Sequence, residues 1–542
     1  MNSSSIAEKA AEPKHPQMDR FNSVERSSSS LFGWILCAIA VAAVCAVLWA
    51  TGSRGSGVTA DSVTYLNAAR TLLHGEGLLD FDEQGRTGGL THYPPLFPIA
   101  LAGVAAIFKV DVEVAARWLN AFLFGGTIVL VGALCRRRLP DPRWALFAAL
   151  LASISVPLVV DHLYALSEPL FLFLSLAALM ELMRYLDTGS RSTFVISGCL
   201  TAAALLARYA GVAVVGTGVL AILLFSEDSW IVRLRRAIAL GAMAVLPLGI
   251  WVMVRPGSGS GTKSSLLPVL HAPSLSIFAS GAETLAYWIV PSSVPSAISL
   301  SLLAAAIAIT SFLLVRNLAP MPPKAVRQTA TGAIPSLLGV LSLFVGCYLL
   351  VLIIGRTFAF EDIIPDDRTL SIMLLPSLVI GIWTLASAGG RERKFAAVLL
   401  GIVALFAGSN LLRSGRFLLN TRSRGLGYVS SVWTNSPVVD SVRKLPAGVK
   451  LYSNLPSAVR FLSRRQVSPV PGMRSLHTGE RNPDYLKQVD DLVQRVKSGD
   501  AAVACFTVSP PNSACVSLAE PQLKMRIQSD DNRGFLIASL PE

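Results

Sequence analysis

The chain has 542 residues, of which 52% are hydrophobic and 15% charged, and its mean hydropathy is +0.56. A water-soluble protein does not carry so many uncharged stretches of about eighteen residues, so the composition excludes a soluble enzyme and indicates a polytopic membrane protein. The apolar residues run continuously rather than in alternation, which favours spanning helices over a barrel. The net charge of +13 does not indicate a nucleic-acid partner, because most Lys and Arg residues stand in short segments between apolar runs.

The N-terminal residues 1–30 are polar, rich in serine and without periodicity, and we predict that they are disordered and cytosolic. The first apolar run, 31–50, is long for the core of a signal peptide. No small-residue cleavage site follows it, so we interpret it as a retained anchor.

Ten further apolar runs follow, which makes eleven predicted spans within a transmembrane domain at 31–412. The runs are 118–134, 144–160, 169–185, 194–207, 210–225, 237–254, 296–315, 335–354, 370–388 and 395–412. The fourth and fifth of these ten could form one kinked helix. Eleven spans and a cytosolic N-terminus place "CRRRLPDPR", "VRLRR", "RNLAPMPPKAVR" and "GGRERK" on the cytosolic side, as the positive-inside rule expects.

The loop 51–117 becomes the first extracytoplasmic loop, and its sequence predicts two helices. Apolar residues recur at helical spacing over 59–74, and the glycines that follow end this helix. The segment 94–108, "PPLFPIALAGVAAIF", is too short to cross a bilayer and is typical of a re-entrant or interfacial helix.

Residues 413–542 are predicted to form a small extracytoplasmic α/β domain. Its expected elements are strands at 449–453 and 501–508, helices near 455–463 and 484–498, and a hairpin at 523–540. Cys505 and Cys515 could pair across a turn if this domain lies in an oxidising compartment.

Charged residues at the outer ends of the spans are the candidate site, because ionisable groups at membrane depth are costly and usually functional. Asp61 follows the first span, and it shares a helix face with Tyr65 at a spacing of four residues. Glu168 begins the fourth span, in "YALSEPLF". Asp61 could serve as a general base or help to hold a divalent metal, and the residues do not separate these roles.

Cations and histidines near the same span ends extend the candidate site. Arg208 and Arg368 offer guanidinium groups to a phosphate at the membrane surface, with snorkelling to lipid as the alternative. The proline pair in "THYPPLFPIALA" places His92 and Tyr93 near the surface, and we expect both, together with Tyr65, to contact the substrate.

The order of several segments resembles the GT-C glycosyltransferases, in the branch that holds protein O-mannosyltransferases, the lipid A aminoarabinose transferase and lipopolysaccharide-core galacturonosyltransferases. These segments are "DSVTYLNAARTLLHGEGL", "THYPPLFPIALA", "ARWLNAFLFGGTIVLVGAL", "LSEPLFLFLSLAAL" and "ALLARYAGVAV". The resemblance places Asp61 at the family's catalytic acid, with Tyr65 at the family's spacing, and Glu168 at the acid that begins the fourth span. Many members carry a second acid where this chain has Ser62.

The resemblance implies a polyprenyl-phosphate sugar as donor and an active site on the extracytoplasmic face. Aminoarabinose transferases bind zinc through an acid and a histidine. In this chain Tyr93 falls near the acidic position and His271 lies in a comparable loop, so no cofactor is certain and a divalent metal remains open.

We therefore expect a glycosyltransferase, hexosyl or pentosyl, in a bacterial inner membrane. It would transfer a sugar with inversion from the lipid-linked donor to a glycan, lipid or protein acceptor. The alternatives are a transporter or flippase of lipid-linked glycans, and a structural scaffold.

Overall fold

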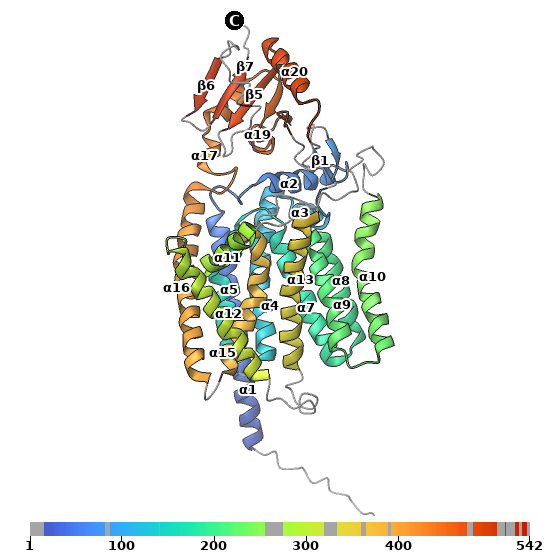
Figure 1. The fold of residues 1–542 in the computed structure, drawn as a ribbon, viewed down its shortest axis with the longest axis vertical. Helices are drawn as coiled ribbons and strands as arrows, with labels where there is room; N and C mark the ends of the chain where they lie inside the picture. Colours follow the sequence, from blue (N-terminus) through green and yellow to red (C-terminus); the bar gives the residue numbers. More distant parts are fainter. Residues whose placement is uncertain are drawn as a thin grey trace, which may run out of the picture.

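The structure is a computed structural model that describes most of the chain. The described residues are 16–81, 87–90, 92–139, 141–254, 275–318, 333–358, 365–388, 392–473, 481–506, 515, 526–530 and 534–538. They form a helical bundle with a small α/β domain on one end (Figure 1). The fold class that the sequence predicts is confirmed.

Each predicted span coincides with a helix or a pair of consecutive helices. The helices are α1 (Pro16–Ala50), α4 (Val112–Arg138), α5 (Pro142–Ile154), α6 (Val156–Leu163), α7 (Glu168–Thr188), α8 (Arg191–Ala207), η1 (Tyr209–Gly211), α9 (Val212–Phe225), α10 (Trp230–Val254), α12 (Ser296–Leu318), α13 (Ala333–Phe358), α14 (Asp367–Leu370), η4 (Ser371–Met373), α15 (Leu374–Ser387) and α16 (Arg393–Arg424). A further helix, α11 (Leu275–Ile289), packs on α12 and α16.

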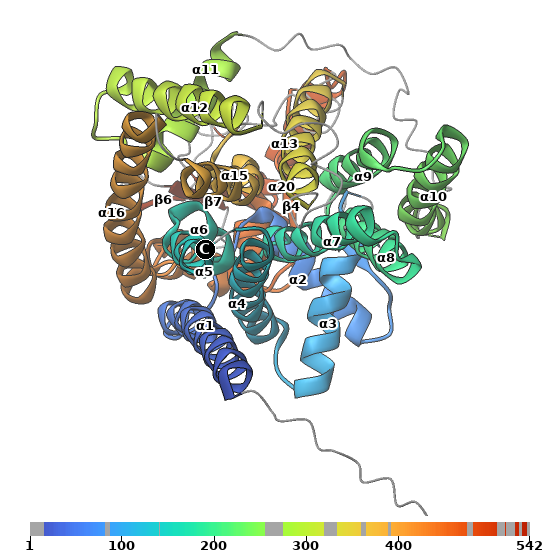
Figure 2. The ribbon, with the colours of Figure 1, turned by 90° about the horizontal axis from the view of Figure 1, so that it is seen from below.

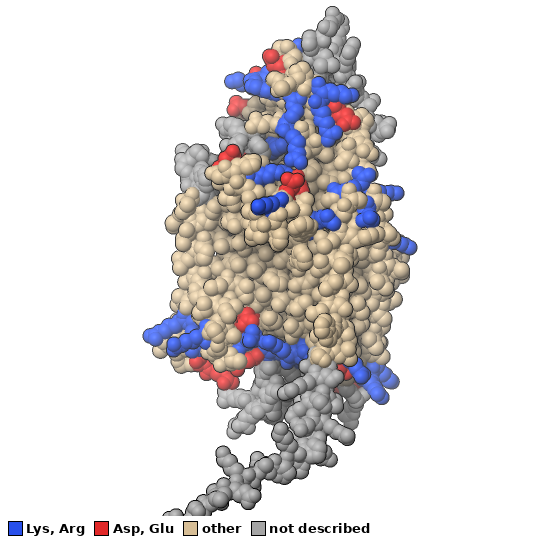
Figure 3. Space-filling model, turned by 180° about the vertical axis from the view of Figure 1, so that it is seen from behind, with Lys and Arg blue, Asp and Glu red and all other residues tan. Residues whose placement is uncertain are grey.

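Length and hydropathy support membrane insertion of this bundle. Among the described residues, eight helices are long and apolar enough to cross a membrane, or nine if the bent pair α5–α6 is one span. The helices α8 and η1–α9 are shorter, and they remain separate helices, as the sequence predicts. Seen from behind, a band without charged side chains separates two charged rims, as expected of an integral membrane protein (Figure 3).

The first helix differs from its predicted boundary. Helix α1 begins at Pro16, within the segment predicted to be disordered, while residues 1–15 lie outside the described part. Extending an existing helix adds one hydrogen bond per residue without a new nucleus, so the apolar span can carry polar turns before it. Helix α1 packs against α4, where a side chain on Gly132 would meet Leu36 (Figure 2).

The first loop forms two helices at the end of the bundle that faces the α/β domain. They are α2 (Ala60–Leu73) and α3 (Leu96–Phe108), close to the predicted bounds (Figure 1). A short antiparallel pair, β1 (Leu79–Phe81) and β2 (Thr87–Gly89), connects them. Helix α2 also packs on α4 and on the α/β domain, so it is held from both sides.

The α/β domain has a five-stranded sheet in the order β4-β3-β5-β7-β6. Its strands are β3 (Lys450–Ser453), β4 (Val467–Pro469), β5 (Ala501–Phe506), β6 (Arg526–Asp530) and β7 (Gly534–Ala538), with helices α17 (Ser431–Thr434), α18 (Pro437–Lys444), α19 (Pro456–Ser463) and α20 (Tyr485–Lys497). β3 pairs in parallel with β4 and β5, and the β6–β7 hairpin adds antiparallel strands. The predicted elements are present, whereas β4 and α18 were not predicted from the sequence.

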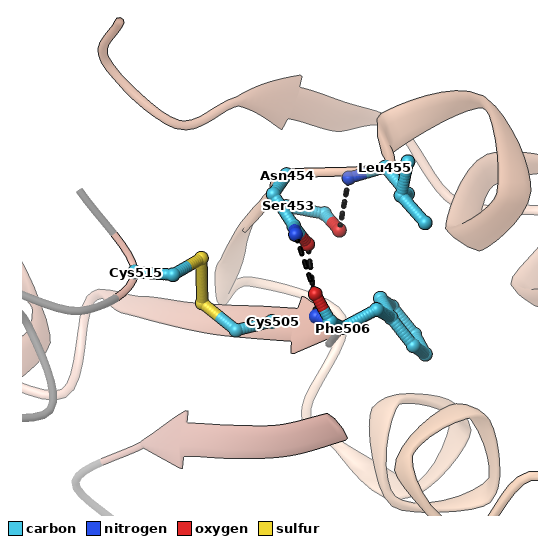
Figure 4. The surroundings of a disulfide bond; sticks show 6 residues. All are labelled: Ser453, Asn454, Leu455, Cys505, Phe506 and Cys515. Carbon is cyan, nitrogen blue, oxygen red and sulfur yellow. Dashed lines mark hydrogen bonds between the residues drawn. A yellow bond between two sulfur atoms is a disulfide. The ribbon is translucent and has the colours of Figure 1, made fainter. Parts of the chain in front are cut away.

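A disulfide joins Cys505 and Cys515 in this domain, so the pairing that the sequence left open is present (Figure 4). The end of the same strand is clamped by Asn454. Its amide donates to the Phe506 carbonyl at 2.7 Å, and its carbonyl accepts from the Phe506 N–H at 2.9 Å (Figure 4). The disulfide and this amide pair fix the strand that lies at the centre of the sheet.

Candidate active site

The N-terminus of α2 is built by a reciprocal cap. The Ser62 N–H donates to the Thr59 hydroxyl at 3.4 Å, and the Thr59 N–H donates to the Ser62 hydroxyl at 3.0 Å. Asp61 therefore lies in the first helical turn, where the helix dipole favours an anion. Ser62 is buried.

The chain just before α2 is pinned by two distant segments. The Gly57 N–H donates to the Leu163 carbonyl at 2.9 Å, and the Tyr428 N–H donates to the Val58 carbonyl at 2.8 Å. Gly427 has a φ of +54°, and a Cβ there would lie 2.1 Å from the Val58 oxygen. Only glycine fits such a close approach in the left-handed region.

Asp61 is held by two partners that come from different parts of the chain. The Tyr93 hydroxyl donates to Asp61 Oδ1 at 2.7 Å. Arg368 Nη2 lies 2.6 Å from Asp61 Oδ2. The Asp61 side chain is 25% exposed and that of Arg368 31%, so a ligand can reach both.

Glu168 contacts Arg368 on the side away from solvent and is fully buried. Its Oε1 accepts from Arg208 Nη1 at 2.7 Å and also from the Nε of Arg368. A chain of ion pairs thus runs from Asp61 through Arg368 and Glu168 to Arg208. The two guanidinium groups and two carboxylates balance in charge, which makes burial of the cluster tolerable.

Tyr65 is buried beside the ion-pair cluster, and its hydroxyl contacts Ser167. Its side chain is 1% exposed, packed against the rings of Tyr93 and Phe97 at 4.8 Å and 5.1 Å. Its hydroxyl pairs with that of Ser167 at 3.1 Å, and Ser167 also accepts from Arg208 at 3.1 Å. Because the ring is buried, the Tyr65 hydroxyl contacts Ser167, and the role of Tyr65 as a substrate contact stays a prediction.

Interruptions between consecutive helices lie near the cluster and position its arginine side chains. α5 and α6 meet at a bend of 54°, where the Val156 N–H donates to Asn410 Oδ1 at 2.9 Å. Arg208 stands in extended backbone between α8 and η1. Arg368 lies on α14, whose first turn is capped by Asp366, the acceptor for the Thr369 N–H at 2.8 Å.

Burial and the charges of the cluster shift the pKa values of Asp61, Tyr93 and Tyr428. Burial by itself would raise the pKa of Asp61, but the charge of Arg368 and the hydrogen bonds from Tyr93 and Arg368 outweigh it, and the pKa lies below its ordinary value. Burial and the negative charge of Asp61 raise the pKa of Tyr93. The same two causes raise the pKa of Tyr428 to about 12. At neutral pH the carboxylate is therefore charged and the phenols are neutral.

The histidines are placed less centrally than Asp61 and its partners. His92 is exposed, and its ring contacts that of Tyr93 at 4.6 Å. His162 is buried in α6 with its Nδ1 2.6 Å from the Leu158 carbonyl. His271 lies outside the described residues. Within the described part of the chain, no group of three or more His, Cys, Asp or Glu residues is arranged to hold a metal ion.

Sequence reasoning missed Asp161, Ser167 and Tyr428. Asp161, on α6, is 3% exposed, hydrogen-bonds to Ser371 and lies within electrostatic reach of Glu168. It also follows the end of a predicted span, so the criterion that selected Glu168 could have selected it. Tyr428 comes from beyond the last span, and no local pattern points to it.

Comparison with known proteins identifies the fold. Residues 92–253 match the model of the dolichyl-phosphate-mannose-protein mannosyltransferase family. The crystal structure of ArnT from Cupriavidus metallidurans in the apo state covers 94% of this chain and 98% of its own, with a TM-score of 0.54 at 16% identity. The chain has the GT-C glycosyltransferase fold.

Two more structures share the GT-C fold with this protein. ArnT bound to undecaprenyl phosphate covers 93% of this chain and 98% of its own, with a TM-score of 0.52 at 17% identity. The arabinofuranosyltransferase AftD from Mycobacteria covers 93% of this chain and 39% of its own, with a TM-score of 0.51 at 16% identity. No curated protein matches the sequence significantly. The resemblance predicted from the sequence motifs is thus confirmed at the level of the fold.

Proposed function

We propose that the protein transfers a glycosyl group from a polyprenyl-phosphate-linked donor to an acceptor hydroxyl, with inversion at the anomeric carbon. The observation that carries this proposal is the convergence of Arg368 and Arg208 beside the partly exposed carboxylate of Asp61, at one end of a bundle with the GT-C fold. Guanidinium groups suit a phosphate, and a carboxylate suits an acceptor hydroxyl.

The reaction assigns a task to each member of the cluster. The acceptor oxygen attacks the anomeric carbon from the face opposite the phosphate, and its proton passes to Asp61. The bond between that carbon and the phosphate oxygen breaks, and polyprenyl phosphate leaves with the electron pair. Arg368 and Arg208 stabilise the charge that develops on the leaving phosphate. Glu168, which is fully buried, is a positioning residue for both.

The low pKa of Asp61 fits this task. A carboxylate that is ionised at every physiological pH is ready to take the proton once the acceptor oxygen has begun to bond to carbon and has become acidic. On the loop before α3, Tyr93 contacts Asp61 and His92 contacts Tyr93, and the sugar or the acceptor would contact both residues there.

The site and the α/β domain are proposed to lie on the extracytoplasmic side of a bacterial inner membrane. The disulfide Cys505–Cys515 supports this orientation, because such bonds persist in oxidising compartments. The opposite rim carries the basic cluster Arg136, Arg137 and Arg138 at the end of α4, as expected of a cytosolic side.

Activity is tested with purified protein in phosphatidylcholine nanodiscs and a panel of undecaprenyl-phosphate hexoses and pentoses, with membrane extract as the acceptor source. We expect release of undecaprenyl phosphate with at least one donor, and loss of that release in Asp61→Asn. Movement of a donor across a liposome membrane without release of the lipid phosphate would instead support the flippase alternative. Consumption of none of the donors would contradict the proposal.

The orientation has its own test in a variant without the exposed free cysteines of the bundle. A cysteine at Glu76, exposed beyond the end of α2, should react with a membrane-impermeant maleimide in intact cells. The matched control is a cysteine at Thr188, exposed at the opposite rim, which should react only after lysis. The reverse pattern would contradict the proposed side.

A further inference from the structure

We infer that Arg368 masks Asp61 in the empty protein and that the donor phosphate unmasks it, so that Asp61 becomes available only after the donor has bound. This inference rests on the proposed function and adds an order of events to it. The masking contact is the ion pair between Arg368 Nη2 and Asp61 Oδ2, at 2.6 Å.

Both carboxylate oxygens of Asp61 are occupied in this state. Oδ1 accepts from the Tyr93 hydroxyl at 2.7 Å, and Oδ2 faces the Arg368 guanidinium. An acceptor hydroxyl that is to give its proton to Asp61 has to replace one of these partners. Tyr93 is neutral, whereas Arg368 neutralises the charge on which proton transfer depends, so Arg368 is the partner whose departure matters.

Arg368 can also leave Asp61 without losing all of its ion pairs, because it contacts Glu168 as well. It is shared between Asp61 and Glu168, and the two contacts use different nitrogens. Glu168 is fully buried and is also held by Arg208, so it cannot follow a ligand outward. Asp61, at the partly exposed end of the chain of ion pairs, is the exchangeable side.

A donor phosphate would compete for the same nitrogen. The Arg368 side chain is 31% exposed, so an anion can approach it from the open side of the site. A phosphate group presents several oxygens to the planar guanidinium fork, whereas the Asp61 pair uses a single close contact. Once the guanidinium turns to the phosphate, Asp61 Oδ2 is free to accept from the acceptor hydroxyl. An acceptor that arrives first meets a neutralised carboxylate.

The test measures binding of undecaprenyl phosphate, the lipid product, to the protein in phosphatidylcholine nanodiscs. Asp61→Asn removes the competitor for Arg368, so we expect this variant to bind the lipid phosphate about three- to tenfold more tightly than the wild type. Tyr93→Phe is the matched control. It removes the other partner of the same carboxylate and should change the affinity by less than about twofold.

Tighter binding could also arise from lost repulsion between the carboxylate and the phosphate. A double-mutant cycle with Arg368→Gln separates the two causes. Masking predicts that the gain from Asp61→Asn disappears in the Arg368→Gln background, because no guanidinium remains to be released. A gain of equal size in both backgrounds would overturn the inference. Asp61→Ala serves as a second variant if Asp61→Asn does not fold.

The outcomes for the inference and for the proposed function differ. If the wild type binds undecaprenyl phosphate and Asp61→Asn binds it equally or more weakly, the masking role is wrong while the proposed function stands. If the wild type and all variants fail to bind the lipid phosphate, the proposed function fails and the inference falls with it.

Discussion

The two rims of the bundle both carry Arg–carboxylate pairs, but they connect them differently. At the rim away from the α/β domain, Arg138 meets Asp187 and Arg236 meets Asp228. At the rim that faces the α/β domain, Arg368 contacts two acids and Glu168 contacts two arginines. The two pairs at the first rim share no residue, whereas Arg368 and Glu168 link three ion pairs into a chain at the other rim.

The carboxylates Asp228 and Glu168 also differ in exposure. The Arg236–Asp228 pair is 37% and 32% exposed, so water and lipid headgroups compensate either member if the other is lost. Glu168 has no exposure, so each of its partners depends on it. A residue in a connected, buried chain acts on several others, and this is why we place function at that rim.

The sharpest test of the comparison is the loss of one carboxylate at each rim. Asp61→Asn should lower turnover by about 10²- to 10⁴-fold, because the variant lacks the carboxylate that takes the proton from the attacking hydroxyl. Asp228→Asn should leave turnover within about twofold. Release of the lipid phosphate measures both, and comparable losses in the two variants would erase the distinction between the rims.

Stability should show the same contrast. Glu168→Gln leaves Arg208 and Arg368 without their shared counter-charge and should lower the free energy of unfolding by about 3 kcal/mol. Asp228→Asn, at the opposite rim, should cost less than about 1 kcal/mol because Asp228 is 32% exposed and its partner Arg236 37%. Thermal unfolding in nanodiscs of the same lipid compares the two, and equal losses would contradict the prediction.

The disulfide tests whether the α/β domain stands apart from the bundle energetically. Replacing Cys505 and Cys515 by serine removes a link across ten residues and should destabilise this domain by about 2–3 kcal/mol. Proteolysis should then cut the α/β domain before the helices, and the wild type should respond to reductant in the same way. Simultaneous loss of the bundle would show that the two parts unfold together.

The junction between bundle and domain depends on Gly427. Gly427→Ala places a Cβ against the Val58 carbonyl in left-handed backbone and should cost about 2 kcal/mol. Gly448→Ala is the matched control, since a Cβ at Gly448 meets no atom within 4 Å, and it should change stability by less than about 0.5 kcal/mol. Unfolding curves measure the loss of stability in each variant, and equal losses would contradict the prediction. We also expect Gly427→Ala to reduce turnover, because Val58 leads directly into the cap of α2.

The smallest expected effect concerns the pH dependence of activity. The pKa of Asp61 is lowered, so the carboxylate and its stabilising contacts are present above that pKa and are lost as the pH falls through it. Tyr93→Phe removes one hydrogen bond that lowers this pKa, and the acid limb of kcat/KM should move to higher pH by less than about one unit. Tyr452→Phe, in the α/β domain, should leave the limb in place. Movement to lower pH would contradict Asp61 as the group that titrates.

The sequence by itself determined the elements and their order. Uncharged runs long enough for a bilayer have one stable backbone solution, the helix, so the spans could be located without knowing their neighbours. The cap at Thr59 and the length of 94–108 similarly depend on adjacent residues, and α2 and α3 were found close to their predicted bounds. Asp61, Glu168, Arg208 and Arg368 were selected one by one, because a charge at a span end is a local signal.

Only the tertiary structure decided which of these charges meet. Arg368 reaches Glu168 across 200 residues of sequence, and no periodicity carries a contact of that separation. Whether Tyr65 touches a ligand or supports Ser167 depends on what covers its ring, and the covering Tyr93 and Phe97 lie on another segment. Tyr428 enters the site only because Gly427 admits the Val58 backbone. Helix formation depends on nearest neighbours in the chain, whereas charge pairing and burial depend on neighbours in space, and packing of the helices determines those.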